Sequence, residues 1–338
     1  MTTGEQHAFH EAHLASTPIR DLGLAVEGTR LQPIVDTFLQ ELRAVGLTRL
    51  SPRFYLSTEW GVPFGTIAVA VPFYLARPEL AALHAERTGM VEGFDPHDLL
   101  RYLRHEVGHV VNYAYRLYER REWVQAFGAI TQPYVEEYRP QPFSRRFVRH
   151  LPGWYAQKHP DEDWAETFAV WMTPAHDWRA EYADRPTALG KLQLCDRLLR
   201  EVATQAPLVT EVQLDEPVAS LGISLDDFYR GGEASTEEPP FGLDGSLRAV
   251  FARSGQSPGE RPAAALMRKL ESQLCTEVYR WTGHFPERTR PLVRHLARRA
   301  ETLALGYPAA DEPRAIVALT ALVTALAMNH VHHGSYLP

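Results

Sequence analysis

The chain has 338 residues, of which 45% are hydrophobic and 23% are charged, the composition of an ordinary globular protein with room for about two domains. Its net charge of -7 argues against a nucleic-acid partner, because nucleic-acid-binding proteins favour a basic face. The two cysteines, Cys195 and Cys275, provide neither a disulfide framework nor a CxxC pair of metal ligands. The composition therefore excludes the class of small disulfide-stapled secreted domains and favours a reducing compartment.

The N-terminus is polar and lacks the apolar segment of a signal peptide. The longest apolar-leaning stretch covers residues 315–328, 14 positions, which is shorter than the roughly 20 residues that a membrane-spanning helix needs. We therefore expect a cytoplasmic protein without a membrane partner, in which this stretch forms a buried helix.

The first third of the chain predicts a flexible arm, a helix and two strands. Residues 1–17 are polar and are expected to form the arm. Apolar residues recur at helical spacing over 31–45. The segments 53–57 and 65–74 are short and rich in β-branched and aromatic residues, which predicts strands. The second strand could lie in the core or could form an edge that pairs with a peptide, and the sequence favours neither.

Two longer helices are expected in the middle of the chain. The first begins at Asp95, whose side chain can cap the free backbone amides, and at Pro96, which suits the first helical position. Its apolar periodicity continues to about Tyr118. Residues 121–152 contain several prolines and are predicted to be irregular, and the second helix begins near Pro160.

The remainder of the chain is predicted to be helical apart from an acidic linker. We expect helices over the ranges 187–203, 262–281, 290–305 and 313–330. Acidic residues outnumber basic ones between Glu211 and Glu238, which predicts a linker. The expected domains are a flexible arm at 1–17, a main domain at 18–206, an acidic linker at 207–246 and a helical C-terminal domain at 247–338.

The segment 104-RHEVGH-109 lies inside the first of the two middle helices. Its histidines, His105 and His109, are four residues apart and therefore share one face, so both imidazoles can reach a single metal ion. Glu106 lies on an adjoining part of the helix surface, where it can hydrogen-bond a metal-bound water without ligating the metal. HExxH fixes only three positions, so a chance occurrence is the alternative to a zinc site.

A catalytic zinc needs a third protein ligand, and the second middle helix offers two candidates. Glu162 and Glu166 are four residues apart (166−162=4) and share a face. One can bind zinc while the other accepts a hydrogen bond from the free ring N–H of a ligating histidine. The apolar neighbours Trp164 and Phe168 argue against a solvated helix face. The two helices together predict one Zn²⁺ per chain, with the choice between the two glutamates open.

Two segments carry a resemblance to a known family. The stretches 104-RHEVGH-109 and 154-WYAQKHPDEDWAETFAVW-171 resemble the gluzincin metallopeptidases, in particular the bacterial family known as putative zinc-binding metallopeptidases. The spacing of Tyr155 and Glu162 (162−155=7) is also similar to the active-site helix of anthrax lethal factor and its relatives. The resemblance covers roughly residues 30–205. It implies an α+β, mostly helical fold: a zincin-like metallopeptidase domain with a small sheet and an active-site helix, followed by an all-α C-terminal region.

The resemblance also implies a set of ligands. His105, His109 and Glu162 match the zinc ligands of the family, and Glu166 matches the carboxylate that hydrogen-bonds a ligating histidine. The opposite assignment of the two glutamates stays open, because WAETFA also resembles the WLNEGFA segment of aminopeptidases.

Two residues are implied to take part in catalysis. Glu106 matches the general base, and Tyr155 matches a residue whose hydroxyl donates to the oxyanion of the tetrahedral intermediate. The alternative for Tyr155 is a core or rim aromatic. His159 is a further candidate for substrate or oxyanion binding, with a structural role at the helix entry as its alternative.

The function predicted from these residues is a zinc-dependent metallopeptidase acting on a peptide or protein substrate. No GxMEN-like segment is present in the sequence, which favours an endopeptidase or a processing peptidase over an aminopeptidase. The alternatives are a catalytically inactive zinc-binding scaffold and a helical interaction protein without metal. The C-terminal helices are candidates for contact with a partner, self-association, substrate delivery or self-inhibition.

Overall fold

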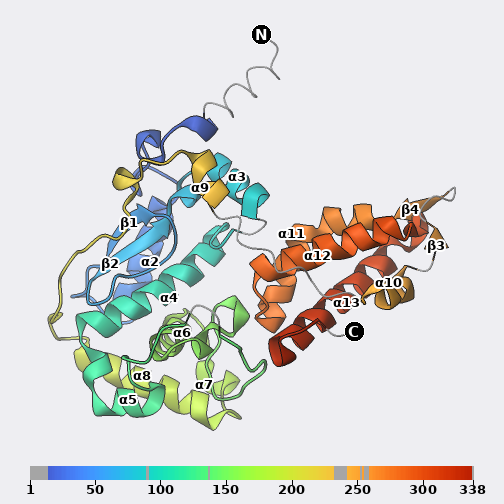
Figure 1. Cartoon of the computed structure of the whole chain (residues 1–338). Helices are drawn as coiled ribbons and strands as arrows, with labels where there is room; N and C mark the ends of the chain where they lie inside the picture. The colour runs from blue at the N-terminus through green and yellow to red at the C-terminus, as the bar shows by residue number, and fades with distance from the viewer. Residues whose placement is uncertain are drawn as a thin grey trace.

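The computed structural model describes residues 14–88, 91–135, 138–231, 242–251, 253–254 and 259–336. These residues form two bodies, an N-terminal body that extends to Gly231 and a helical C-terminal body that begins near Asp244 (Figure 1). Most of the expected flexible arm, residues 1–13, lies outside the described residues, as do residues 232–241 of the expected linker.

The sheet of the N-terminal body consists of two parallel strands, β1 (Arg53–Ser57) and β2 (Ala68–Pro72). All of β2 is buried. On the side away from β1, the carbonyl of Gly61 accepts a 2.8 Å hydrogen bond from the amide of Ala70. β2 is therefore a core strand with a neighbour on each side, and the segment around Gly61 forms the outer edge.

Helices make up most of the N-terminal body. They are α2 (Gln32–Ala44), α3 (Pro78–Thr88), α4 (Pro96–Ala114), α5 (Arg121–Phe127), α6 (Pro160–Met172), α7 (Trp178–Glu181), α8 (Pro186–Val202) and α9 (Leu225–Gly231), with 3-10 segments η1 (Ile19–Leu22), η2 (Phe73–Ala76), η3 (Leu117–Glu119), η4 (Pro152–Gln157) and η5 (Val218–Ser220). The prediction that residues 121–152 are irregular was wrong at α5, whose C-cap is Gly128 with a φ of 110°. A two-turn helix of this length lies below what apolar periodicity can reveal.

The close contact between α4 and α6 organises the middle of this body. The side chain of Asp95 caps α4 by accepting a 2.9 Å hydrogen bond from the amide of Asp98, as the sequence predicts. Across the crossing, the indole of Trp164 donates to the carbonyl of Gly108 at 2.8 Å. Both helices are buried over most of their length, so the polar residues on their facing sides are removed from bulk solvent.

Much of the segment that composition marks as an acidic linker belongs to the N-terminal body. The carbonyl of Glu211 accepts a hydrogen bond from the amide of Ile67 at 2.9 Å, and the carbonyl of Asp215 accepts one from the Ser57 hydroxyl at 3.0 Å. The acidic side chains face outward while the backbone carbonyls satisfy donors of the sheet. Composition reports only the side chains, so it did not reveal this packing.

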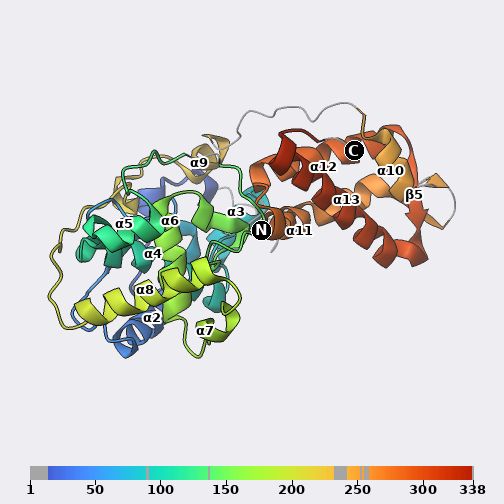
Figure 2. The same cartoon turned by 90° about the horizontal axis from the view of Figure 1, so that it is seen from below.

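The C-terminal body has a hydrophobic core of its own. It contains α10 (Asp244–Val250), α11 (Ala263–Thr282), α12 (Pro286–Thr302) and α13 (Glu312–His333), with the short segment η6 (Ala309–Asp311) and a small antiparallel sheet in the order β3 (Arg253–Ser254), β5 (Leu305–Pro308), β4 (Glu260–Pro262). Figure 2 shows the three long helices packed beside one another. The mostly helical α+β class expected from the sequence is confirmed, with this small second sheet as an addition.

Helix α13 is longer than the apolar stretch inside it suggested. It has 22 residues, and the segment Ala309–His333 contains an 18-residue window with a mean hydropathy of 1.6, so by length and composition alone it could cross a membrane. The argument that the stretch is too short is therefore wrong. One face of α13, with Leu319, Val323 and Leu326, lies in the core of the C-terminal body, and core helices of such composition pass the same test.

Candidate metal centre

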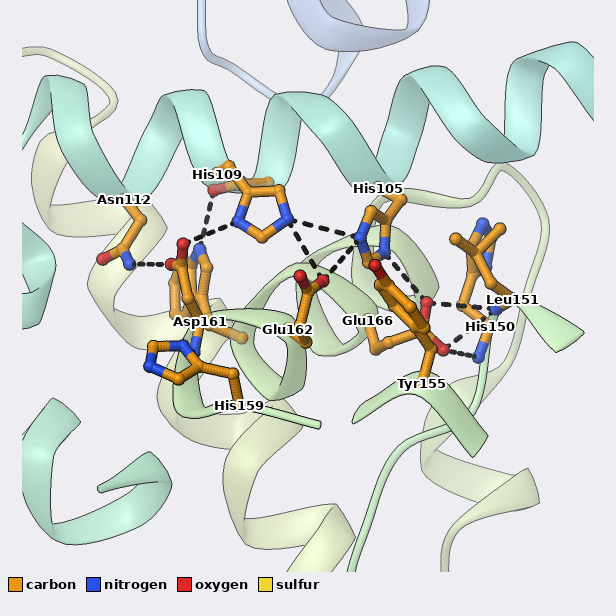
Figure 3. A network of polar contacts seen from close by, with 12 residues as sticks. His105, His109, Asn112, His150, Leu151, Tyr155, His159, Asp161, Glu162 and Glu166 are labelled. Atoms are coloured by element: carbon orange, nitrogen blue, oxygen red, sulfur yellow. Dashed lines mark hydrogen bonds and ion pairs between the residues drawn. The ribbon is translucent and has the colours of Figure 1, made fainter. Parts of the chain in front are cut away.

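Three buried side chains from α4 and α6 converge on one point (Figure 3). The Nε2 atom of His105 lies 3.0 Å from Oε2 of Glu162 and 3.3 Å from Nε2 of His109. The third side of the triangle, from His109 Nε2 to Glu162 Oε2, is also 3.3 Å. Within the described ranges, these three residues form the group of histidine, cysteine or carboxylate side chains whose ligand atoms could hold one metal ion.

The size of this triangle suits zinc. Zinc binds histidine nitrogen and carboxylate oxygen at about 2.0–2.2 Å in tetrahedral sites, which places neighbouring ligand atoms about 3.3 Å apart. The observed separations of 3.0, 3.3 and 3.3 Å therefore match three corners of such a tetrahedron. The residues present fit the ion that the sequence predicts.

A carboxylate fixes the orientation of each histidine ring. The Nδ1 atom of His105 lies 2.9 Å from Glu166 Oε1, and Nδ1 of His109 lies 2.8 Å from Asp161 Oδ2. With each Nδ1–H donating to a carboxylate, each Nε2 lone pair points into the triangle, the tautomer that metal binding requires. The geometry thus places Glu162 at the centre and Glu166 behind His105.

Glu166 is held from the other side by the backbone that precedes η4. The amides of His150 and Leu151 donate to its Oε2 at 2.6 and 2.9 Å. The segment is tied in turn to α4, because the guanidinium of Arg101 donates to the carbonyl of His150. Sequence reasoning found Glu166 but not these backbone donors.

Asp161 is a site residue that sequence reasoning missed. Besides contacting His109, its carboxylate accepts hydrogen bonds from the Asn112 amide at 2.6 Å and from the Tyr113 hydroxyl. In the sequence, the one sign of its role is that it directly precedes Glu162. That position indicates a contact with His109 only when the crossing of α6 over α4 is known. Both histidines therefore have a carboxylate partner of their own.

The charges of the centre favour a bound cation. Burial by itself lowers the pKa of His105, but hydrogen bonds to Glu162 and Glu166 outweigh it and raise that pKa to about 9. Burial raises the pKa of Glu162, but His109 and His105 outweigh it and hold that pKa well below its usual range. The carboxylates thus stabilise positive charge at the point where the three ligand atoms meet, which is the electrostatic requirement of a metal site.

Glu106 lines a cavity of about 390 Å³ that opens over the triangle. Its carboxyl is buried, and burial raises its pKa, with His105 and His109 opposing that rise. A carboxylate with a raised pKa is a stronger base than a solvated one, so Glu106 is suited to accept a proton inside this cavity. The structure places it where the sequence predicted, beside the ligands but outside the triangle.

Tyr134 and Tyr155 also line this cavity. Tyr155, in η4, packs its ring against His105 with centroids 5.6 Å apart. Its hydroxyl is 3.3 Å from that of Tyr134, which donates to Oε1 of Glu162 at 2.8 Å. Burial, Glu162 and Tyr134 raise the pKa of Tyr155 well above its usual value, so its hydroxyl stays protonated and available as a donor. Tyr134 lies in the proline-rich segment, where no motif pointed to it.

His159 has a structural role at the start of α6. Its Nδ1 accepts a hydrogen bond from the amide of Asp161 at 3.2 Å, and its Nε2 lies 3.0 Å from the carbonyl of Gln132. Both ring nitrogens are engaged within the protein although the ring borders the cavity. Of the two readings that the sequence left open, the structure supports the capping role.

A comparison with models of protein families gives a match over part of the chain. Residues 64–189 match the family model described as "putative zinc-binding metallo-peptidase", a range that includes α4, η4 and α6. No curated protein and no solved structure matches the chain. The matched range contains every residue of the triangle, its two carboxylate partners, Glu106 and Tyr155. Residues 64–189, a little over a third of the chain, are therefore similar to the family of putative zinc-binding metallo-peptidases.

Proposed function

We propose that the protein is a zinc-dependent peptidase that hydrolyses peptide bonds, with His105, His109 and Glu162 as the zinc ligands. The observation that carries this proposal is the triangle of three ligand atoms, 3.0 to 3.3 Å apart, at the floor of a cavity that Glu106 also lines. A buried carboxylate that is free of the ligand triangle but faces the same cavity is what a hydrolase requires and a structural metal site does not.

The proposed chemistry divides among few groups. Zinc, when bound, supplies Lewis-acid polarisation of the scissile carbonyl and lowers the pKa of water. Glu106 accepts the proton of the attacking water and returns it to the leaving amine. The Tyr155 hydroxyl, kept protonated by its surroundings, donates to the oxygen on which negative charge develops.

The lining of the cavity supports a peptide substrate with a large apolar side chain. Trp60 stacks on Tyr102 with ring centroids 5.3 Å apart, and the exposed Phe64 meets Tyr113 edge-on at 4.9 Å. The segment that carries Trp60 and Phe64 also forms the outer edge beside β2 and borders the cavity. An extended peptide laid along it would place a side chain against this aromatic wall.

The carboxylates of the cavity support internal rather than terminal cleavage. Glu106, Asp161 and Glu162 line it, and each already has a role as base, histidine partner or ligand. The described lining therefore leaves no further acid to hold the free amine of a substrate. We infer an endopeptidase or a processing peptidase.

The test combines metal content with a single isosteric substitution. Elemental mass spectrometry of the purified protein is expected to find about one zinc per chain. Glu106→Gln is expected to retain that zinc and to lose hydrolysis across a broad peptide library. Full hydrolysis by Glu106→Gln would contradict the role of Glu106, and a zinc-loaded wild-type protein that cleaves nothing would indicate the zinc-binding scaffold instead.

A further inference from the structure

The backbone that leads to Tyr155 adopts an unusual conformation at two consecutive residues. Gly153 has a φ of 83° and Trp154 a φ of 63°, both in the left-handed region. Glycine enters this region freely, but for a bulky residue such as tryptophan this conformation is uncommon and strained. Such a conformation persists only where surrounding contacts hold it, so the contacts of this turn identify what fixes the position of Tyr155.

One of these contacts comes from the C-terminal body. A Cβ atom placed on Gly153 would lie 2.4 Å from the ring of Tyr279, which is buried near the end of α11. The hydroxyl of Tyr138 also donates to the carbonyl of Gly153 at 2.8 Å. The turn therefore contacts both a residue of its own body and a residue of the C-terminal body.

A second set of contacts ties the neighbouring residues to the end of α11. The indole of Trp154 donates to the carbonyl of Trp281 at 3.3 Å. The guanidinium of Arg149 lies 4.2 Å from the centroid of Trp154 and 5.4 Å from that of Trp281, and it donates to the carbonyl of Arg280. These contacts flank the amides that hold Glu166 and the hydroxyl of Tyr155, so docking of α11 and the geometry of the centre involve one short segment.

We propose that Tyr279 is a positioning residue for the metal centre: by packing on the Gly153–Trp154 turn, it places the Tyr155 hydroxyl at the cavity. The consequence for catalysis rests on the proposed function. Tyr279 itself is neither one of the three ligands nor part of the described cavity lining, and it acts through the backbone on which Tyr155 is carried. Through Tyr279, the C-terminal body would then help to position a residue of the metal centre, although the two are far apart in the sequence.

The test compares two buried tyrosines of the C-terminal body in the full-length protein. Tyr279→Ala removes the ring that packs on Gly153, whereas Tyr307→Ala removes a ring in β5 that contacts Phe251. We expect Tyr279→Ala to lower kcat by about 10- to 100-fold with little change in KM, because misplacing a donor affects the transition state more than substrate binding. Tyr307→Ala is expected to keep kcat within about twofold, and Tyr279→Phe, which keeps the ring, is expected to retain activity.

A double-mutant cycle tests the route through Tyr155. In a Tyr155→Phe background, Tyr279→Ala is expected to lower kcat by less than about twofold further, since the hydroxyl that it positions is already gone. If the two effects multiply instead, Tyr279 does not act through Tyr155 and the inference is overturned.

Hydrogen–deuterium exchange of the amides of residues 150–157 gives a readout independent of activity. We expect faster exchange there in Tyr279→Ala and unchanged exchange in Tyr307→Ala. Unchanged exchange in Tyr279→Ala would overturn the inference even if kcat fell. If the wild-type protein hydrolysed no peptide, the proposed function would be wrong. The exchange result alone would then decide whether Tyr279 holds the turn.

Discussion

Gly108 of α4 and Ala165 of α6 lie so close that a methyl group placed on Gly108 would come within 2.8 Å of the Cα atom of Ala165. This contact lies between His105 and His109 on one helix and beside Glu162 and Glu166 on the other. The absence of a side chain at Gly108 therefore sets the spacing of the two helices that carry the ligands.

Gly108→Ala is predicted to lower the free energy of unfolding and to weaken zinc binding. Alanine is favoured over glycine inside a helix by about 1 kcal/mol, but here the added methyl meets backbone, and forcing the helices apart is expected to outweigh that gain. Gly190→Ala in α8 is the matched control, because a Cβ there meets nothing within 4 Å. The higher helix propensity of alanine should therefore raise the free energy of unfolding of this variant. Denaturant unfolding and zinc competition with a chelator measure both effects, and a stabilised Gly108→Ala would refute the argument.

The carboxylates behind the histidines are predicted to tune zinc affinity without being ligands. Asp161→Asn and Glu166→Gln are each expected to weaken zinc binding about 10- to 100-fold, the usual cost of losing the partner of a ligating histidine. Glu162→Ala, which removes a ligand atom, is expected to leave no stoichiometric zinc. Glu201→Gln on the surface of α8 serves as control. If Glu166→Gln abolished binding and Glu162→Ala only weakened it, the assignment of the two glutamates would be reversed.

The motif residue Arg104 is predicted to stabilise α4 on α2. Its guanidinium forms two hydrogen bonds with the carboxylate of Glu41, at 2.8 and 2.9 Å, in a largely buried position. Arg104→Met leaves Glu41 without its partner and is expected to lower the free energy of unfolding by about 3–5 kcal/mol. Adding Glu41→Leu is expected to restore much of the loss. Equal instability of the single and double variants in urea would contradict this account.

Phe64 is predicted to determine substrate preference. Its side chain is 63% exposed at the border of the cavity and rests edge-on against Tyr113. Under the proposed function, Phe64→Ala is expected to raise KM about tenfold for peptides with a large apolar side chain next to the cleaved bond, because about 1.5 kcal/mol of apolar contact is lost. Peptides with alanine at that place should be little affected. An equal change in KM for both kinds of peptide would show that Phe64 does not determine substrate preference.

The C-terminal body is predicted to lose stability in acid through His284. Burial, with repulsion from His330 and Arg288, lowers the pKa of His284 to about 3 from an ordinary 6.5. The unfolded chain therefore binds a proton that the folded protein refuses between those values, so the free energy of unfolding falls as the pH drops below about 6.5. His284→Gln is expected to flatten this fall in thermal unfolding between pH 7 and pH 4. Burial also lowers the pKa of His84 and of His150, both in the N-terminal body, to about 4. The stability of the whole protein is therefore expected to fall somewhat in acid even in the His284→Gln variant.

The parts of the site that the sequence predicted are those encoded by local pattern. The cap at Asp95, the i, i+4 pair of histidines and the spacing of Glu162 and Glu166 all follow from helix geometry, and the structure brings these side chains together. Asp161 and Tyr134 were missed because their contacts depend on how α6 crosses α4 and on the path of an irregular segment. Neither leaves a periodic signal.

For the fold as well, elements with a local sequence pattern were predicted and packing between distant segments was not. The long helices of both bodies and strand β1 follow from periodicity and composition. The short α5 and the packing of residues 207–231 against the sheet do not, because the first is too short for a pattern and the second depends on backbone hydrogen bonds. Contact between the two bodies was also beyond prediction, since it joins residues more than a hundred positions apart.

The contact of Arg149 and Trp154 with the end of α11 has a consequence for the helix itself. The last carbonyls of a helix have no partner within it and carry the negative end of the helix dipole. The carbonyls of Arg280 and Trp281 are two of these, and they receive a guanidinium and an indole N–H from the other body. Beside the C-cap residue Gly283, the N-terminal body thus satisfies two of the last carbonyls of α11 and recognises its main chain. This junction should tolerate exchange of the side chains at 280 and 281 far better than any change that shortens the helix.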